Sequence, residues 1–280
     1  MQSQGATNIA SLAEYAGEDR VVSAHELALT FRAQDHYTIN VKSGIPTLDK
    51  YCDGFRDGEL ITISGRTKQG KTLLAQSMSQ KFSDAGQSPL WFSFEVPARQ
   101  FLSQFSTVPF IYMPAKLKAH AMDWLEERIM ESFMKYGTRI VFIDHLHYLF
   151  DIQRSRNPSL DIGAIIRRLK GIAVNNEFVI FLLCHTSKAK EENESYESIR
   201  DSSFVAQESD CVIMVKRTPD DGENTARARV EFHRRTGVLE KVVFLEKHGN
   251  YLVERSFQGD EDHQERGVDN HRGRRNHDND

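Results

Sequence analysis

Short runs of apolar residues alternate along the chain with longer segments in which apolar residues recur every three or four positions. The short runs predict strands, and the longer segments predict helices. The predicted strands are residues 60–64, 90–94, 139–143, 178–184 and 211–215, and the predicted helices are residues 23–34, 73–82, 116–136 and 162–175. Because most of these strands do not alternate apolar with polar residues, both of their faces are expected to be covered. The pattern therefore predicts an α/β fold with a mostly parallel, twisted sheet flanked by helices.

Towards the end of the chain, the pattern changes from continuous apolar runs to alternating positions. Residues 226–232, 241–245 and 251–253 place apolar and polar side chains in turn, which predicts an antiparallel C-terminal extension of the sheet. Residues 43–58 are rich in turn-forming pairs such as Ser43-Gly44 and Asp53-Gly54, so they predict a turn-rich segment before the first long strand.

Two segments lie outside this pattern. Residues 1–42 form an N-terminal extension in which Ser23 and Glu26 carry a helix-start signature, because the serine can cap the helix and the glutamate can reach back. The helix that follows either packs on its own domain or docks on a neighbouring subunit. Residues 256–280 are polar and mixed in charge, which predicts a disordered tail that is either solvated or in contact with nucleic acid.

The composition is that of an ordinary globular protein. The chain has 280 residues, of which 39% are hydrophobic and 27% charged, so it can form one large domain with a substantial core. The net charge of −4 supplies no overall attraction for nucleic acid, although a local basic stripe would suffice. The three cysteines have neither zinc-ligand spacing nor a disulfide pattern, and no apolar run has the length of a membrane span. We therefore expect a cytoplasmic protein with no membrane contact.

Residues 65–72 carry the most specific chemical signal in the sequence. They fit the pattern G-x-x-x-x-G-K-[ST], with a predicted strand before them and a predicted helix after them. The eight residues are Gly65, Arg66, Thr67, Lys68, Gln69, Gly70, Lys71 and Thr72. In such a phosphate-binding loop, or P-loop, backbone N–H groups and the helix N-terminus surround the phosphates, the lysine reaches the β- and γ-phosphates, and the threonine hydroxyl binds Mg²⁺. The sequence therefore predicts that the chain binds ATP with Mg²⁺ and hydrolyses it.

Three further polar residues stand at the ends of predicted strands. Asp144 follows the apolar run 139–143, the form of strand whose carboxylate orients Mg²⁺ in P-loop proteins. Glu95 ends the strand after the P-loop helix, where it is either an acid that orients the attacking water or an ordinary surface carboxylate. His185 ends the strand 178–184, where it either reports the loss of the γ-phosphate or is a histidine with its hydrogen bonds satisfied.

These residues, in this order, resemble the RecA-like motor domain of DnaB-family replicative helicases over about residues 43–253. Residues 43–49 are similar to the first segment of that motor, residues 93–97 to its Ser-Leu-Glu-Met-Pro motif, and residues 143–146 to its Ile-Asp-Tyr-Leu segment. The resemblance implies a RecA-like P-loop NTPase domain over residues 43–255. It also implies that Glu95 is the catalytic glutamate.

The last part of the resemblance concerns DNA and neighbouring subunits. Residues 199–210 are similar to a stretch that begins in a DNA-gripping loop, which implies DNA contacts for Arg200, Asp201 and Ser203. Residues 232–237 are similar to a segment with an arginine finger, a side chain that reaches the ATP of the next subunit, and this role falls on Arg235. The implied partners are single-stranded DNA, further copies in a homo-hexameric ring, and replication proteins in a bacterial or phage-infected cell.

A second predicted DNA-facing loop follows the strand that ends at Asp144. It contains Arg154 and Arg156, whose expected contacts are with phosphates and independent of base sequence, and an ordinary solvated loop is the alternative. The chain also departs from the family pattern. Histidine replaces glutamine at His185 and lysine at His233, and we expect residues 1–42, which precede the motor, to hold no collar domain of the family.

Other functions share this fold and this nucleotide site. A recombination mediator that binds DNA as a filament and a KaiC-like regulatory ATPase are the main alternatives, and the segment 200–210 disfavours both. A nucleotide or small-molecule kinase is disfavoured by the Arg235 segment and by the long sheet extension. The leading hypothesis is an ATP-dependent DNA helicase that hydrolyses ATP at subunit interfaces and translocates on single-stranded DNA in replication.

Overall fold

The computed structural model describes residues 14–17, 20–33, 39–149, 157–185, 202–219 and 222–256. The chain divides into two compact units, residues 1–38 and residues 39–280. In the first unit, helix α2 (Ala24–Ala33) begins where the Ser23 Oγ atom accepts a hydrogen bond from the Glu26 N–H at 3.0 Å. The serine cap predicted from the sequence is therefore confirmed.

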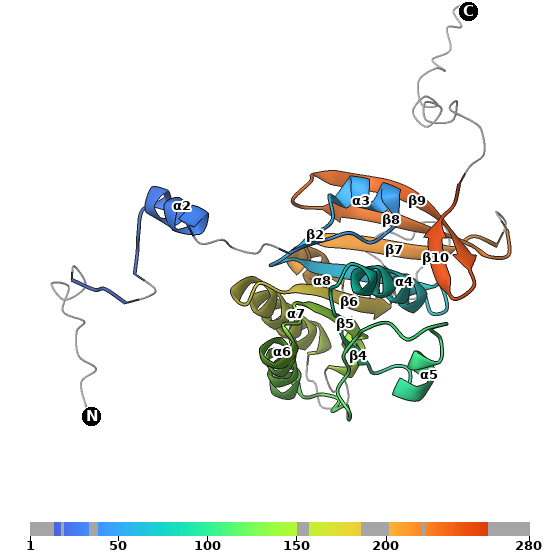
Figure 1. The fold of residues 1–280 in the computed structure, drawn as a ribbon, viewed down its shortest axis with the longest axis horizontal. Helices are drawn as coiled ribbons and strands as arrows, with labels where there is room; N and C mark the ends of the chain where they lie inside the picture. The colour runs from blue at the N-terminus through green and yellow to red at the C-terminus, as the bar shows by residue number, and fades with distance from the viewer. Residues whose placement is uncertain are drawn as a thin grey trace, which may run out of the picture. The chain divides into compact units, whose positions relative to one another are not determined.

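An eight-stranded sheet forms the centre of the second unit (Figure 1). The strands are β3 (Leu60–Gly65), β4 (Leu90–Ser93), β5 (Ile140–Asp144), β6 (Val179–His185), β7 (Cys211–Arg217), β8 (Thr225–His233), β9 (Val238–His248) and β10 (Tyr251–Glu254). Their order is β10-β9-β8-β7-β3-β6-β5-β4. Strands β7, β3, β6, β5 and β4 pair in parallel, whereas β8, β9 and β10 join antiparallel. The predicted parallel sheet with an antiparallel extension is confirmed.

Helices cover both faces of this sheet. They are α3 (Pro46–Cys52), α4 (Lys71–Asp84), α5 (Ala98–Leu102), α6 (Met122–Tyr136), the 3₁₀ helix η1 (Leu146–Tyr148), α7 (Pro158–Asn175) and α8 (Ser202–Glu208). One hydrophobic cluster joins the sheet to α3 and α4, and a second joins it to α6 and α7. A short antiparallel pair, β1 (Asn40–Val41) and β2 (Phe55–Arg56), flanks α3. Among the described helices, none is long and apolar enough to cross a membrane.

Stacked aromatic rings fill the first of these clusters. The Phe142 ring lies 4.5 Å from that of Trp91 and 4.6 Å from that of Phe181, measured between ring centroids, and is nearly parallel to both. Phe82 of α4 stacks on the same ring at 6.1 Å. Because Phe142 lies two residues before Asp144 on β5, the stack holds in place the strand that carries this carboxylate.

Two sequence predictions about helices are wrong in detail. The helix predicted from residue 116 begins only at Met122, because His120 has φ 55° and Ala121 has φ −133°, and neither conformation is helical. The turn-rich segment 43–58 contains helix α3, with Pro46 in its first turn, where a missing N–H costs nothing. Its start is fixed by a contact from far along the chain, since the Thr47 N–H donates to Glu254 Oε2 at 2.8 Å.

Candidate active site

The P-loop connects the end of β3 to the start of α4. Gly65 has φ 148°, and a Cβ atom there would lie 2.3 Å from the Val215 carbonyl oxygen of β7, so only glycine fits. Gly70 has φ 99° and caps α4. The Gln69 side chain accepts a hydrogen bond from the Arg217 N–H at 2.6 Å, which ties the loop to β7. Thr67 and Lys68 at the tip of the loop are exposed.

Lys71 is buried at the first position of α4. Its Nζ atom donates to the carbonyl oxygens of Gly65 and Arg66, both at 2.9 Å, and to His185 Nδ1 at 3.0 Å. Burial lowers the pKa of Lys71, and the nearby Glu95 and Asp144 carboxylates oppose that shift. The ammonium group therefore stands at the mouth of the P-loop, in contact with the end of β6.

Thr72 and Asp144 form a hydroxyl–carboxylate pair next to the loop. The Thr72 Oγ1 atom donates to Asp144 Oδ2 at 2.8 Å, and Asp144 is completely buried. Within the described residues, the second carboxylate oxygen, Oδ1, has no hydrogen-bond partner. Burial raises the pKa of Asp144 to about 6. A hydroxyl beside a carboxylate oxygen left without a donor suits a hard divalent cation such as Mg²⁺, which binds oxygen ligands. The residues present therefore fit a Mg²⁺-bound nucleotide.

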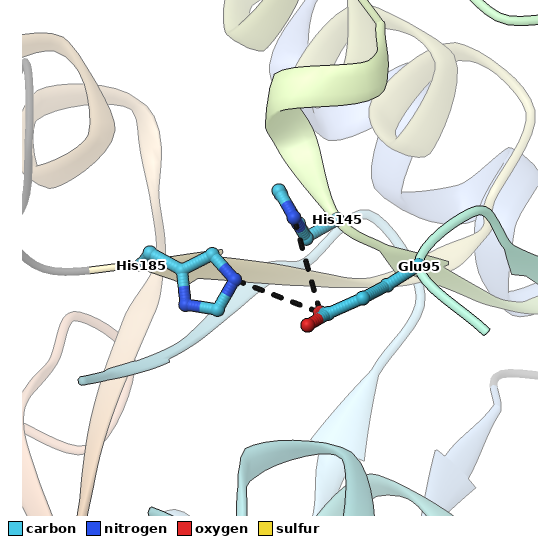
Figure 2. Close-up of side chains that lie close together, drawn as sticks. All are labelled: Glu95, His145 and His185. Atoms are coloured by element: carbon cyan, nitrogen blue, oxygen red, sulfur yellow. Dashed lines mark ion pairs between the residues drawn. The ribbon is translucent and has the colours of Figure 1, made fainter. Parts of the chain in front are cut away.

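Figure 2 shows Glu95, His145 and His185 pointing toward one another. Glu95 follows β4, His145 follows β5 and His185 ends β6, and these three strands are adjacent in the sheet. Glu95 Oε2 lies 3.8 Å from His145 Nε2 and 3.6 Å from His185 Nε2. Burial, together with the neighbouring His185, lowers the pKa of His145 to about 3. Burial and the Lys71 ammonium lower the pKa of His185 as well.

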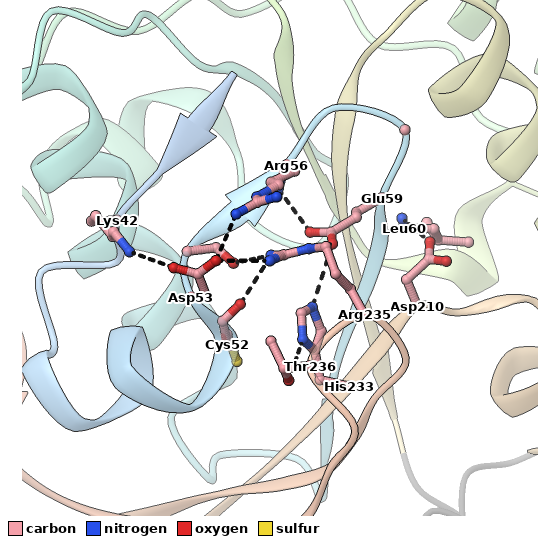
Figure 3. Close-up of polar contacts among 12 residues, drawn as sticks. Lys42, Cys52, Asp53, Arg56, Glu59, Leu60, Asp210, His233, Arg235 and Thr236 are labelled. Carbon is pink, nitrogen blue, oxygen red and sulfur yellow. Dashed lines mark hydrogen bonds and ion pairs between the residues drawn. The ribbon is translucent and has the colours of Figure 1, made fainter. Parts of the chain in front are cut away.

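Arg235 lies at the opposite end of the sheet, in the turn between β8 and β9 (Figure 3). Its guanidinium donates to Glu59 Oε1 at 2.7 Å, to Asp53 Oδ2 at 3.2 Å, and to the carbonyl oxygens of Cys52 and Gly54, both at 2.9 Å. Burial acts to raise the pKa of Glu59, but hydrogen bonds from His233, Arg235 and the Arg56 N–H leave it lowered. Arg235 is thus held within its own chain, away from its own P-loop.

The sequence of the chain matches the model of a known protein family. The model of the DnaB-like helicase C terminal domain matches residues 40–107 and 106–252, which is most of the chain. The chain belongs to this family.

Among curated relatives, the replicative DNA helicase DnaB of Mycoplasma pneumoniae is 25% identical over 66% of this chain and 48% of its own length. That of Helicobacter pylori strain J99 is 26% identical over 62% of this chain and 44% of its own length. The chain thus spans about half the length of the curated relatives it matches.

Solved structures support the RecA-like ATPase fold of the family. A solved ATPase domain superposes with a TM-score of 0.72 at 19% identity, over 84% of this chain and 99% of its own. A DnaB-like replicative helicase studied for its interactions with primase gives 0.71 at 18% identity, over 89% and 70% of the two chains. A KaiC-like protein from Pyrococcus horikoshii gives a lower score of 0.61, over 78% and 100%.

Within this DnaB-like domain, the structure brings together some of the predicted site residues. Lys71, Thr72, Asp144, Glu95 and His185 all lie around the mouth of the P-loop, at the carboxyl ends of neighbouring parallel strands. Arg154, Arg156, Arg200 and Asp201 lie outside the described residues, and so does the side chain of Ser203, whose backbone belongs to α8. The DNA contacts expected of these five residues stay predictions.

Sequence reasoning missed one residue of this site. His145 packs its ring 4.4 Å from that of His185, between centroids, and its Nδ1 atom accepts a hydrogen bond from the His147 N–H at 3.3 Å. The signal was present in the sequence, because His145 directly follows Asp144, and polar residues at the ends of adjacent parallel strands meet at one edge of the sheet.

Proposed function

We propose that this chain is the motor domain of an ATP-dependent DNA helicase that acts in replication as a homo-oligomeric ring. The observation that carries the proposal is the arrangement around the P-loop in a chain of the DnaB-like family. There, Lys71 faces the loop, Thr72 bonds Asp144, and Glu95 follows β4, the strand next to that of Asp144. The proposed cofactors are ATP and Mg²⁺. The proposed location is the cytoplasm of a bacterial or phage-infected cell.

Each residue at the mouth of the P-loop has a distinct proposed role. Lys71 exchanges its bonds to the loop carbonyls for bonds to the β- and γ-phosphates, while Thr72 and Asp144 hold Mg²⁺. When bound, Mg²⁺ neutralises negative charge on the phosphates. Glu95 orients the attacking water and accepts its proton. His185, which contacts both Lys71 and Glu95, responds when the γ-phosphate leaves and passes the change to the segment after β6.

The position of Arg235 supports hydrolysis at a subunit interface. Arg235 bonds Glu59, which directly precedes β3, whereas the P-loop begins at Gly65, the last residue of this six-residue strand. At about 3.3 Å per residue, the two ends of β3 are roughly 17 Å apart. This guanidinium therefore cannot reach the phosphates bound by its own chain. We propose that it stabilises charge on the ATP of the next subunit after it gives up its bonds to Glu59 and Asp53.

Single-stranded DNA is the proposed substrate of the ring. Arg200, Asp201 and Ser203, together with Arg154 and Arg156, are the proposed DNA-facing residues, and their contacts would be with the phosphate backbone. Replication proteins are proposed as further partners. Primase is one candidate, since one of the similar solved helicases was studied for its interactions with it.

The proposal is tested by ATP hydrolysis with and without single-stranded DNA, on the full chain and on Lys71→Ala. We expect Mg²⁺-dependent hydrolysis that single-stranded DNA stimulates and that the variant loses. Stimulation should weaken as salt rises, because the contacts are with phosphates. Hydrolysis that is indifferent to DNA at low salt would contradict the proposed motor and favour a regulatory ATPase. No hydrolysis at all would contradict the catalytic assignment.

A further inference from the structure

Three metal-ligating side chains converge beside the P-loop without taking part in Mg²⁺ binding as proposed above. One ligand atom from each of Glu95, His145 and His185 can be chosen so that all three lie within 4.8 Å of one another (Figure 2). Each residue sits at the carboxyl end of a different strand of the rigid parallel sheet. The cluster is therefore preorganised by the fold and does not depend on a long loop.

The chemistry of these ligands differs from that of the Thr72–Asp144 pair. Two imidazole nitrogens and one carboxylate oxygen are the ligand set of Zn²⁺ and related transition cations, whereas Mg²⁺ binds oxygen. Metal–ligand distances of about 2.0–2.2 Å place tetrahedral ligand atoms roughly 3.4 Å apart. The Glu95 Oε2 atom is 3.6 Å from His185 Nε2 and 3.8 Å from His145 Nε2, so a contraction of a few tenths of an ångström would suffice for these two pairs.

We propose that Glu95, His145 and His185 form a binding site for a divalent transition cation such as Zn²⁺, separate from the Mg²⁺ position. The three protein ligands leave a fourth position for water or for an oxygen of a bound phosphate. The two histidines depart from the family motif that this chain resembles. His145 stands where the family motif Ile-Asp-Tyr-Leu has tyrosine, and His185 stands where the family has glutamine.

Occupation of the site requires Lys71 to move. An ammonium group can only donate, so the 3.0 Å contact from Lys71 Nζ makes His185 Nδ1 an acceptor and puts the ring proton on Nε2. His145 Nδ1 likewise accepts from the His147 N–H at 3.3 Å. Each ring must shift its proton to Nδ1 before Nε2 can bind a cation. For His185 this becomes possible when Lys71 turns away, and removal of the lysine should therefore strengthen binding.

The functional consequence rests on the proposed ATPase activity. A cation on Glu95 ties up the carboxylate that is proposed to orient water, and it fixes His185 at the same time. Zn²⁺ bound there should therefore hold the domain in a state that does not hydrolyse ATP. The site would make hydrolysis sensitive to transition cations.

Binding itself is tested on the full chain without nucleotide or Mg²⁺, by calorimetric titration with Zn²⁺ and by the visible absorption of Co²⁺. His145→Tyr and His185→Gln restore the family residues, and Glu95→Gln keeps the shape of the carboxylate. Each variant should bind Zn²⁺ at least about 10–100-fold more weakly, the loss that even outer-shell changes cause. Each should also lose the intense Co²⁺ absorption of a tetrahedral site. Lys71→Ala should bind more tightly than the unaltered chain.

Two controls separate this site from adventitious histidines. His248→Gln changes an exposed histidine that pairs with Glu246 on β9, and a triple change of His263, His271 and His277 removes those near the C-terminus. Both control variants should still bind one Zn²⁺ ion per chain as tightly as the unaltered chain does. Equal binding by the unaltered chain and by all three site variants would overturn the proposal. Unchanged or weaker binding by Lys71→Ala would overturn the placement of the cation beside that lysine.

The activity measurement is kept distinct from the binding measurement. If the chain hydrolyses ATP, the Zn²⁺ concentration for half-inhibition should be at least about tenfold higher for His145→Tyr than for the unaltered chain, in line with its weaker binding. Binding without any hydrolysis would leave the metal site standing and refute the proposed function. Hydrolysis without Zn²⁺ binding that depends on these three residues would refute the metal site and leave the proposed function standing.

Discussion

Substitution of Arg235 by alanine separates the contacts that this side chain makes within its own chain from its proposed role at the ATP of the next subunit. Within its own chain, the guanidinium bonds Glu59, Asp53 and two carbonyl oxygens. In the proposed ring, it reaches the ATP of the next subunit. The first role affects the free energy of unfolding, and the second affects turnover.

The loss of stability can be estimated from the contacts. The Glu59 side chain is only 8% exposed, and without Arg235 it retains the Arg56 N–H as a donor at 2.7 Å and His233 nearby. Loss of one hydrogen bond to a buried charged group costs roughly 1–3 kcal/mol. Asp53 is about half exposed, so its pair with Arg235 adds little. Domains typically have a free energy of unfolding of about 5–15 kcal/mol, so the variant should remain folded after such a loss.

The loss of turnover is expected to be far larger. An arginine finger contributes about 10³–10⁵ in rate in other NTPases, so Arg235→Ala should reduce kcat by at least about 10³ while nucleotide affinity stays within severalfold. Urea unfolding measures the first effect, and steady-state hydrolysis with fluorescent-nucleotide titration measures the second. Mixed oligomers of Arg235→Ala and Lys71→Ala subunits should regain activity at interfaces that combine an intact P-loop with an intact arginine.

Two matched variants make the result decisive. Glu59→Gln removes the charge that holds Arg235, so it should lower stability without abolishing turnover. Arg234→Ala changes the neighbouring arginine of the same turn, whose contact is with the Gln207 carbonyl oxygen. Turnover by Arg235→Ala that equals turnover by Arg234→Ala would refute the role in trans.

Three further predictions address the rest of the site. Glu95→Gln should bind ATP like the unaltered chain, but its kcat should be about 10²–10⁴-fold lower, as single-turnover hydrolysis would measure. A kcat within twofold of the unaltered chain would exclude Glu95 as the residue that orients water. The raised pKa of Asp144, about 6, means that the folded chain keeps a proton that the unfolded chain releases between pH 4 and 6, so stability falls as pH rises through this window. Asp144→Asn should therefore stabilise the nucleotide-free chain by on the order of 3 kcal/mol above pH 6 and by little at pH 4, as urea unfolding at the two pH values would show. A difference in stability between the variant and the unaltered chain that does not depend on pH would contradict a buried carboxylate. Phe142→Ala should cost about 3–5 kcal/mol in urea unfolding, because its ring stacks on Trp91 and Phe181 in a closed core, and a cost below 1 kcal/mol would contradict that packing.

The sequence predicted the parts of the fold that depend on local patterns. Strands β5 and β6 are continuous apolar runs that end in polar residues, and the P-loop is a contiguous motif, so these features can be recognised from the sequence alone. Helix α3 was missed because a bond from Thr47 to Glu254 helps to fix it, and a local window cannot contain that bond. The excess length predicted for α6 has a similar cause, since the backbone conformation of His120 breaks an otherwise helical pattern.

The candidate site likewise contains residues that a local motif predicts and residues that only the folded sheet brings together. Lys71 and Thr72 belong to a local motif, whereas the closeness of Glu95, His145 and His185 depends on the order in which β4, β5 and β6 lie in the sheet. The bonds of Arg235 to Asp53 and Glu59 join residues more than 170 positions apart, so nothing near Arg235 in the sequence indicates them. Resemblance to the family pointed to the role of Arg235 but not to the partners that hold it in its own chain.

Strand separation tests the central claim most directly. The full chain would be mixed with a forked DNA duplex that carries a fluorophore and a quencher on opposite strands, with ATP and Mg²⁺, and Lys71→Ala would serve as the matched control. The account predicts that fluorescence rises with ATP in the unaltered chain and not in the variant. Hydrolysis of ATP stimulated by the same DNA, with no strand separation at any protein concentration, would contradict a helicase motor and indicate an ATPase that binds DNA without unwinding it.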